Sequence, residues 1–347
     1  MSLMTKKYSK CQHENHEPHK LSRSKTKPCC PNCNSQKHVI YYGYRRAKAG
    51  LVKVFRCTEC NNNFTTRTLR YTQYPNQIIL KAISTYNLGY TQLETLNRIN
   101  RRFKTKISQP TLSTWVKRYS DIFTFNYLRK KYVIDPKEII VKKKFYHQQV
   151  YDFKYHKLKL NIAAKMYPAI KKYINEILTS LDNTLFESGP RCSSPSEDIK
   201  QILTRNLLPK IRIRKIKTNN ATKIASLSKD LAHTNRERHK RIQNFFLIND
   251  SATIAIEVPV YLRPKEARMF KIPITAPLTG HIDILQIRKA QIHILDYKPD
   301  ASFDKNTKIQ LLLYAFLLSK RTNIPLENFT CPYFDDRNYH QFKPVAK

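Results

Sequence analysis

Two aspartates and a lysine stand in neighbouring strand-like segments near the end of the chain. Residues 280–285 predict one strand, which carries Asp283, and residues 292–298 predict a second, which carries Asp296 and Lys298. Side chains alternate along a strand, so Asp296 and Lys298 point to the same side. If the strands form a hairpin, Asp283 meets Asp296 at one end of the sheet. Paired carboxylates suit Mg²⁺ or Mn²⁺, and a neighbouring lysine can orient an attacking water and stabilise charge on phosphorus.

An apolar helix follows these strands. Residues 309–318 are almost entirely apolar, apart from Gln310 and Tyr314. These two residues are four apart and therefore share one helix face. They are either polar groups satisfied within a core or side chains presented to the carboxylates.

Three short motifs occur here in a fixed order: G-x-x-D at 280–283, D-x-K at 296–298 and Q-x-x-x-Y at 310–314. Together they resemble the PD-(D/E)XK nuclease superfamily, in particular its RecB-like branch, which includes the CRISPR-associated exonucleases. The resemblance spans about residues 210–347. It implies an α/β restriction-endonuclease-like core, with a mixed central sheet flanked by helices. It also implies metal ligands at Asp283 and Asp296, a catalytic lysine at Lys298, and supporting residues at Gln310 and Tyr314.

Two upstream residues also fit the resemblance. The segment 235–246 is similar to the family's first motif and carries His239 in the place of the family's histidine. Glu257 lies in a segment similar to the strand that commonly precedes G-x-x-D. A helical histidine and a strand glutamate are both commonly structural, which is the alternative interpretation. Iron–sulfur members need four cysteines around this domain, and only Cys192 and Cys331 are present, so we expect no cluster.

A second set of metal-binding residues lies near the start of the chain. Two C-x-x-C pairs, Cys30 with Cys33 and Cys57 with Cys60, are separated by 23 residues. Such knuckles complete a closed, structural zinc site. Strand-like runs between the pairs predict a zinc ribbon. The alternative, a disulfide framework, needs an oxidising compartment that nothing in the sequence indicates.

Two further features of this region remain open. Cys29 adjoins Cys30, and the spacing favours Cys30 as the ligand. Whether a second metal binds near the N-terminus is undecided; the candidates are Cys11, His13, His16 and His19.

The pattern changes to helical spacing after Pro75. Apolar residues recur over 78–86, Thr91 and Glu94 form a candidate capping box, and a third helix is predicted to begin near Ser108. Three short helices with a polar, basic third helix predict a helix-turn-helix. The third segment resembles the recognition helix of insertion-element transposases, in which a zinc ribbon often precedes such a domain. A plain helical bundle is the alternative.

Candidate DNA contacts come from both N-terminal modules. They are side chains able to reach phosphates or base edges, namely Arg45, Arg46, Thr111, Ser113, Thr114, Lys117 and Arg118.

The charge of the chain also indicates a polyanionic partner. It has 64 Lys and Arg against 25 Asp and Glu in 347 residues, a formal net charge of +39. Residues 1–209 carry +26 of this and residues 210–347 carry +13. A basic surface gains affinity for nucleic acid by releasing counterions, so DNA is the expected partner.

The composition excludes other classes of protein. The five glycines match neither a P-loop nor a dinucleotide-binding turn, so we expect no ATP site. No apolar run is long enough to span a bilayer, and no secretory signal is evident, so we expect no membrane association. We expect a cytoplasmic, nucleoid-associated protein of prokaryotic origin.

These observations predict a multidomain chain. The expected parts are a basic flexible tail (1–27), a zinc ribbon (28–70), a helix-turn-helix (75–120), a helical connector or nuclease extension (121–209) and a nuclease domain (210–347). The expected function is Mg²⁺- or Mn²⁺-dependent DNA hydrolysis, with structural Zn²⁺. The alternatives are a non-catalytic DNA-binding regulator or a mobile-element protein related to transposases. The sequence leaves open exonuclease against endonuclease action, strand preference, the DNA sequence read, the oligomeric state, the pathway and the role of 121–209.

Overall fold

The computed structural model describes most of the chain, and the chain divides into two compact units, Met1–Arg67 and Thr68–Lys347. The residues described are 28, 30, 32–33, 35–47, 50–65, 74–147, 149–206, 211–216, 219–229, 235–269, 272–299, 301 and 306–344. The predicted tail, with its Cys and His cluster, and Cys29 lie outside these residues.

The first unit contains a small antiparallel sheet. Strands β1 (Val39–Ala47) and β2 (Gly50–Cys57) pair, and β3 (Asn63–Phe64) adds to β2. The register shifts at Gly43, where φ is +118°, a conformation that glycine adopts without a steric penalty. Cys30, Val39 and Cys57 form a minimal buried core. So small a core needs additional cross-linking to be stable.

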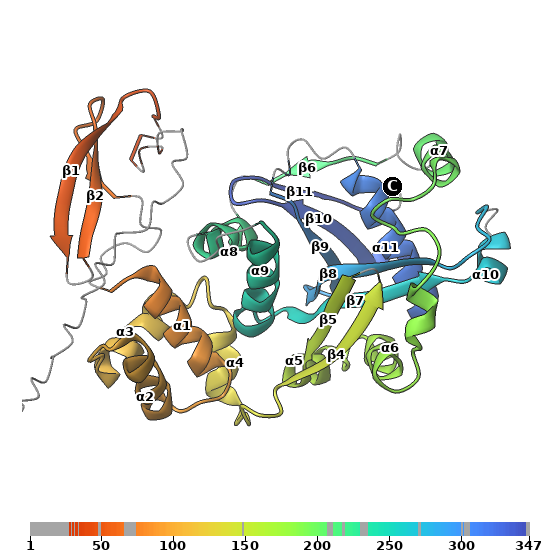
Figure 1. The fold of residues 1–347 in the computed structure, drawn as a ribbon, viewed down its shortest axis with the longest axis horizontal. Helices are drawn as coiled ribbons and strands as arrows, with labels where there is room; N and C mark the ends of the chain where they lie inside the picture. Colours follow the sequence, from red (N-terminus) through yellow and green to blue (C-terminus); the bar gives the residue numbers. More distant parts are fainter. Residues whose placement is uncertain are drawn as a thin grey trace, which may run out of the picture. The chain divides into compact units, whose positions relative to one another are not determined.

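The second unit is built on one eight-stranded mixed sheet with the order β4-β5-β7-β8-β9-β10-β11-β6 (Figure 1). Every neighbouring pair is antiparallel except β9 with β10. The strands are β4 (Ile140–His147), β5 (Gln149–His156), β6 (Arg214–Lys215), β7 (Thr253–Leu262), β8 (Leu278–Arg288), β9 (Gln291–Tyr297), β10 (Phe329–Phe334) and β11 (Tyr339–Phe342). This mixed sheet fits the α/β core that the sequence predicts.

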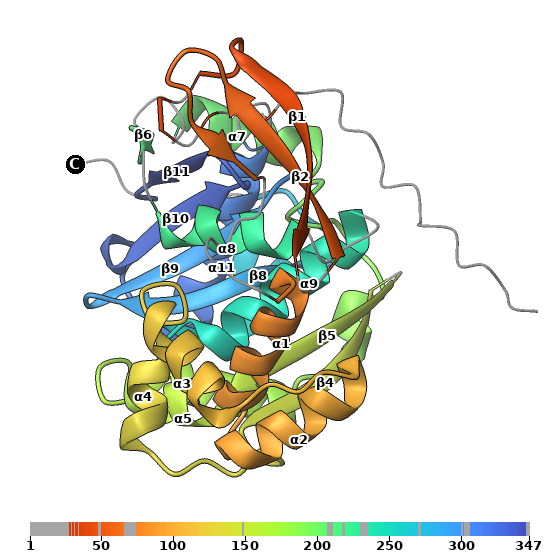
Figure 2. The ribbon, with the colours of Figure 1, turned by 90° about the vertical axis from the view of Figure 1, so that its left-hand side faces the viewer.

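Helices pack against the sheet and beside it (Figures 1 and 2). The helix α11 contacts β7 to β10, and α9 contacts β5, β7 and β8. The α-helices are α1 (Asn76–Asn87), α2 (Gln92–Phe103), α3 (Gln109–Arg118), α4 (Phe125–Lys131), α5 (Lys157–Ala163), α6 (Pro168–Thr179), α7 (Glu197–Asn206), α8 (Asn220–Lys229), α9 (Asn235–Asn249), α10 (Pro264–Arg268) and α11 (Thr307–Thr322). The described residues also include the 3₁₀ turns η1 (Asn183–Phe186) and η3 (Leu326–Asn328). None of the helices described is both long and apolar enough to cross a membrane.

The helical boundaries follow local signals. Thr91 caps α2 and forms the predicted capping box with Glu94. Gly89, at φ +112°, follows α1, and Pro110 lies in the first turn of α3. Helices α5 and α6 lie in the segment predicted as a helical connector or nuclease extension. Pro168 begins α6, where its missing N–H leaves no hydrogen bond unmade.

Helices α1 to α4 pack directly on the sheet-bearing part of their unit. Apolar residues of α1, α2 and α3 share one hydrophobic cluster with α8, α9 and the sheet. Asn249, at the end of α9, accepts a hydrogen bond from Asn87 (2.9 Å) and donates one to Ser84 (2.9 Å). In Figures 1 and 2 α1 lies against α9. The helical cluster and the sheet therefore form one body.

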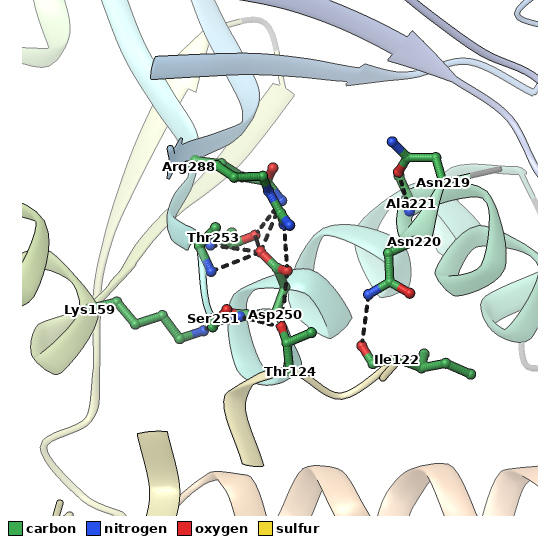
Figure 3. A network of polar contacts seen from close by, with 12 residues as sticks. Ile122, Thr124, Lys159, Asn219, Asn220, Ala221, Asp250, Ser251, Thr253 and Arg288 are labelled. Atoms are coloured by element: carbon green, nitrogen blue, oxygen red, sulfur yellow. Dashed lines mark hydrogen bonds and ion pairs between the residues drawn. The ribbon is translucent and has the colours of Figure 1, made fainter. Parts of the chain in front are cut away.

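A buried aspartate strengthens this junction (Figure 3). Asp250 accepts hydrogen bonds from Thr253 (2.8 Å), Gln286 (3.0 Å) and Thr124 (3.3 Å), the last of which precedes α4. Arg288 forms an ion pair with the same carboxylate at 2.9 Å. A buried charge is tolerated only when it is satisfied in this way. The network holds α4 to strands β7 and β8.

Candidate active site

The hairpin of β8 and β9 brings two aspartates together. The strands are joined by Lys289 and Ala290, both at positive φ (49° and 56°), which is the geometry of a tight two-residue turn. The register pairs Ile284 with Leu295, so Asp296 lies opposite Asp283 at the next position. Both are buried, at 8% exposure for Asp283 and 1% for Asp296. The predicted hairpin is therefore present, and its two carboxylates meet.

Burial affects the two aspartates in opposite directions because their neighbours differ. Burial and the charge of Asp283 raise the pKa of Asp296 well above its ordinary value. Burial alone would also raise the pKa of Asp283, but the adjacent His239 outweighs it and the pKa is lowered. Asp283 thus stays ionised. For Asp296, the positive charge of Lys298 does not offset burial and the charge of Asp283, so the protonated form is favoured.

His239 reaches this pair from α9. Its Nε2 lies 2.8 Å from Asp283 Oδ2, and the backbone N–H of Tyr297 donates to the same oxygen at 3.3 Å. Burial lowers the pKa of His239, but the carboxylate of Asp283 outweighs this effect and, with Glu257 and Asp296, raises the pKa to about 9. The ligand atoms of His239, Asp283 and Asp296 all lie within 4.8 Å of one another.

Glu257 occupies a strained position in β7. Its φ is +51°, which is rare for a non-glycine residue within a strand and is typical of functional sites. Gln243 donates a hydrogen bond to its Oε1 at 2.7 Å. Burial, followed by the charge of Asp283, raises the pKa of Glu257 to about 7. This carboxyl group therefore exchanges its proton near neutral pH.

Lys298 belongs to a line of polar contacts that leads into α11. Its Nζ lies 3.0 Å from Asp296 Oδ2 and donates to Gln310 Oε1 at 3.1 Å. The amide of Gln310 in turn donates to the hydroxyl of Tyr314 at 2.9 Å. Each ammonium or amide is thereby held in one orientation by the next residue. The helix positions the lysine beside the carboxylates.

Gly280 permits the close approach of α11 to β8. A Cβ atom at this position would lie 2.4 Å from Cε1 of Tyr314 and 3.1 Å from Sγ of Cys192. No side chain fits there without displacing the tyrosine ring. The glycine of the G-x-x-D motif is therefore explained by packing.

A cavity of about 430 Å³ opens onto this cluster. Residues predicted from the sequence line it, namely Asp283, His239, Glu257, Gln310, Tyr314 and the motif glycine Gly280. Residues that the sequence did not single out also line it: Gln149, Val150, Tyr151, Arg191, Ser193, Lys240 and His281. Strand alternation pointed to His281, because it lies two residues before Asp283. No local sequence signal connects Tyr151 with this site, because it lies more than 130 residues before Asp283.

The four cysteines of the two C-x-x-C pairs form a second cluster. Cys30 Sγ lies 3.5 Å from Cys60 Sγ, and Cys33 Sγ lies 3.5 Å from Cys57 Sγ. All four sulfur atoms lie within 4.8 Å of one another. Zinc bonded to sulfur at about 2.3 Å in a tetrahedron would hold the sulfurs about 3.8 Å apart. The cluster is compatible with one zinc ion.

The other candidate DNA contacts are distributed over β1 and α3. Arg45 and Arg46 are exposed on β1, and Lys117 and Arg118 are exposed at the end of α3. The remaining three, Thr111, Ser113 and Thr114, also lie on α3. Ser113 donates to Gln92 at 3.1 Å, and Thr114 donates to the carbonyl of Pro110 at 2.9 Å.

Comparison with known families identifies one match. Residues 183–343 match the model of the PD-(D/E)XK nuclease superfamily. The predicted resemblance to this superfamily is therefore confirmed for this segment, which begins before the predicted boundary at 210; the RecB-like branch stays a prediction. No curated protein and no solved structure gives a significant match.

Proposed function

Because residues 183–343 match the PD-(D/E)XK nuclease superfamily, we propose that the protein is a divalent-metal-dependent DNA nuclease. The observation that carries the proposal is the convergence of Asp296 and Lys298 on Asp283, which lines the cavity, with His239 and Gln310 in contact with them. Members of this superfamily typically hydrolyse phosphodiester bonds. The +39 charge supports a nucleic acid as the substrate.

The residues fit a divalent cation. Asp283, Asp296 and His239 supply two carboxylates and an imidazole with converging ligand atoms. Asp296 Oδ2 is buried, and Lys298 forms an ion pair with it at 3.0 Å. These three residues would hold Mg²⁺ or Mn²⁺, which when bound lowers the pKa of a coordinated water and offsets phosphate charge.

The surrounding side chains have separate roles in this proposal. Lys298, held by Gln310, orients the nucleophile and stabilises negative charge on the phosphoryl oxygens. Tyr314 fixes the amide of Gln310. Glu257 lines the cavity and has a pKa of about 7, so it can accept or return a proton near neutral pH.

The binding surfaces are assigned to the N-terminal half of the chain. Helices α1 to α3 act as a helix-turn-helix, with Thr111, Ser113, Thr114, Lys117 and Arg118 of α3 contacting DNA. The cysteine cluster holds a structural zinc ion, and Arg45 and Arg46 contact phosphates. The shared core of α1 and α9 supports a fixed geometry between α3 and the carboxylates.

Cleavage assays with labelled DNA test the proposal. Linear and circular DNA, single- and double-stranded, are incubated with Mg²⁺, Mn²⁺ or EDTA. Cleavage is expected with either metal and not with EDTA, and Asp296→Ala and Lys298→Ala should abolish it. Lys320→Ala, an exposed position on α11, is the matched control. Cleavage that persists in both site variants overturns the proposal. Binding without metal-dependent cleavage supports a regulator, and strand-transfer products support a transposase.

A further inference from the structure

A cluster of aromatic rings, with one stacked pair, reaches the cavity that Asp283 lines. The rings of Tyr151 and His281 are parallel within 4°, with centroids 3.8 Å apart. Behind His281, the ring of Phe186 lies 5.3 Å away and that of Phe145 lies 6.4 Å away. Phe145, Phe186 and His281 are buried, whereas Tyr151 is only half-buried. Among these four described rings, Tyr151 is the most exposed.

The hairpin that carries Tyr151 is firmly anchored. β4 and β5 pair along their length, with Ile140 opposite His156 at one end and His147 opposite Gln149 at the other. β5 also pairs with β7. Lys143 donates to three carbonyl groups around the end of α6, at 2.8 to 3.2 Å. Phe153, on the same face of β5 as Tyr151, is fully buried. β4 and β5 lie at one edge of the sheet (Figure 1), and this pairing fixes the backbone that carries Tyr151.

Polar groups near Tyr151 match the chemistry of a nucleotide. Gln149, whose amide donates to the Tyr151 hydroxyl at 2.7 Å, lines the cavity, as does Ser193. Arg191 and Lys240 line it as well and place positive charge where a phosphate would lie. The cavity volume of about 430 Å³ is in the range of small-ligand sites.

We propose that Tyr151 stacks on an unpaired nucleobase of the substrate and thereby extends the stacked pair of Tyr151 and His281 by one ring. The base would occupy the cavity beside Tyr151, with its phosphate toward His239 and Asp283. In a continuous duplex both faces of every base are covered by neighbours, so such a ring stacks only on a terminal, frayed or single-stranded base. The proposal rests on the nuclease function and specifies the strand state that the site accepts. β4 and β5 precede the matched segment 183–343, so this specificity would come from outside it.

Fluorescence of 2-aminopurine tests the stacking without depending on cleavage. The full chain carrying Asp296→Ala is titrated into a single-stranded oligonucleotide with 2-aminopurine at either end, and into the same strand in a blunt duplex. Stacking on Tyr151 should quench the single-stranded probe. Adding Tyr151→Leu, which keeps apolar bulk at the anchored position, should abolish the quenching. It should also weaken single-strand binding by about 10-fold or more, since stacking on an aromatic ring contributes about 1–3 kcal/mol per base.

Two further variants separate stacking from a general loss of structure. Tyr151→Trp should keep the quenching and the affinity. Tyr146→Leu changes a tyrosine on the other strand of the hairpin, which is 58% exposed and is not among the residues lining the cavity, and should have no effect. Unchanged quenching in Tyr151→Leu, or an equal loss of affinity for single strand and duplex, overturns the proposal.

The two proposals fail separately. Absence of metal-dependent cleavage by the unaltered chain, with Tyr151-dependent quenching intact, overturns the nuclease and leaves the stacking site. Normal cleavage with quenching that does not depend on Tyr151 overturns the stacking site alone.

Discussion

His239 Nε2 lies 2.8 Å from Asp283 Oδ2, so a helix that begins at Asn235 and a strand that begins at Leu278 share one charged contact. The carboxylate keeps the histidine protonated, and the imidazolium keeps the aspartate ionised. A divalent cation would compete with this pair for the same oxygen.

Replacing His239 therefore tests its part in the site. His239→Gln should lower kcat/KM for DNA cleavage by about 10- to 100-fold, because it removes one of the three groups that would hold the cation and breaks the contact with Asp283. Steady-state cleavage at several Mg²⁺ concentrations measures the effect. His340→Gln, on β11, should change the rate little. Equal cleavage rates in His239→Gln and His340→Gln would show that His239 has no part in the site.

The amide of Gln310 gives a second prediction. Gln310→Leu removes the acceptor that Lys298 uses at 3.1 Å while keeping the side-chain size. The lysine should then sample other orientations, and kcat should fall by about 10-fold or more with little change in KM. Gln310→Glu restores an acceptor and should recover part of the rate. A change confined to KM would instead assign Gln310 to substrate binding.

The contact between Gly280 and Tyr314 predicts a loss of stability. Gly280→Ala places a methyl group 2.4 Å from the tyrosine ring and should lower the free energy of unfolding by about 1–3 kcal/mol, because a packed core resists insertion. Urea denaturation measures this change. In a double-mutant cycle, Tyr314→Leu should reduce the cost of the alanine. Additive effects of the two substitutions would contradict the steric explanation.

The parts of this site that were predictable from the sequence are those fixed by local geometry. Asp283, Asp296 and Lys298 lie in one hairpin, where alternation and a two-residue turn determine which side chains meet. Gln310 and Tyr314 follow from the helical repeat. In each case the informative residues are less than 20 positions apart.

The other parts of the fold and of the site depend on contacts between segments that are far apart in the sequence. The sheet order places β5 beside β7, about 100 residues later in the chain, and no pattern near Tyr151 records that neighbour. Likewise, the contact of Asn87 with Asn249 joins helices from opposite halves of the chain. The positive φ of Glu257 is a local feature, but it is imposed by the surrounding sheet and is not indicated by residue type.

Lys159 provides a prediction about pH. It is fully buried on α5, and its Nζ donates to the carbonyls of Leu247 and Asp250, both at 2.5 Å. Burial lowers its pKa to about 7, an effect that the charge of Asp250 only partly opposes. In the unfolded chain the pKa returns to an ordinary lysine value of about 10.4.

The direction in which the free energy of unfolding changes with pH follows from the number of protons bound in the native and unfolded states. Between pH 7 and about pH 10 the unfolded state keeps the proton that the native state has released, so this residue makes the free energy of unfolding rise with pH by up to about 1.4 kcal/mol per unit. Lys159→Met removes the contribution. Urea denaturation at pH 6.5, 7.5 and 8.5 should show a steeper rise for the wild type than for the variant. Parallel pH profiles would mean that the carbonyl groups keep Lys159 charged.

The cysteine cluster predicts the zinc content and its site. Purified protein should contain one zinc per chain if only Cys30, Cys33, Cys57 and Cys60 bind it. Cys57→Ser should lose the zinc and unfold the first unit, because metal binding supplies most of the folding energy of so small a core. The melting of the second unit should remain, since Thr68–Lys347 has its own hydrophobic clusters. Cys29→Ser, the control, should retain zinc. Two zinc ions per chain, with one lost on removing His13 and His16, would instead show that the N-terminal segment binds a second ion.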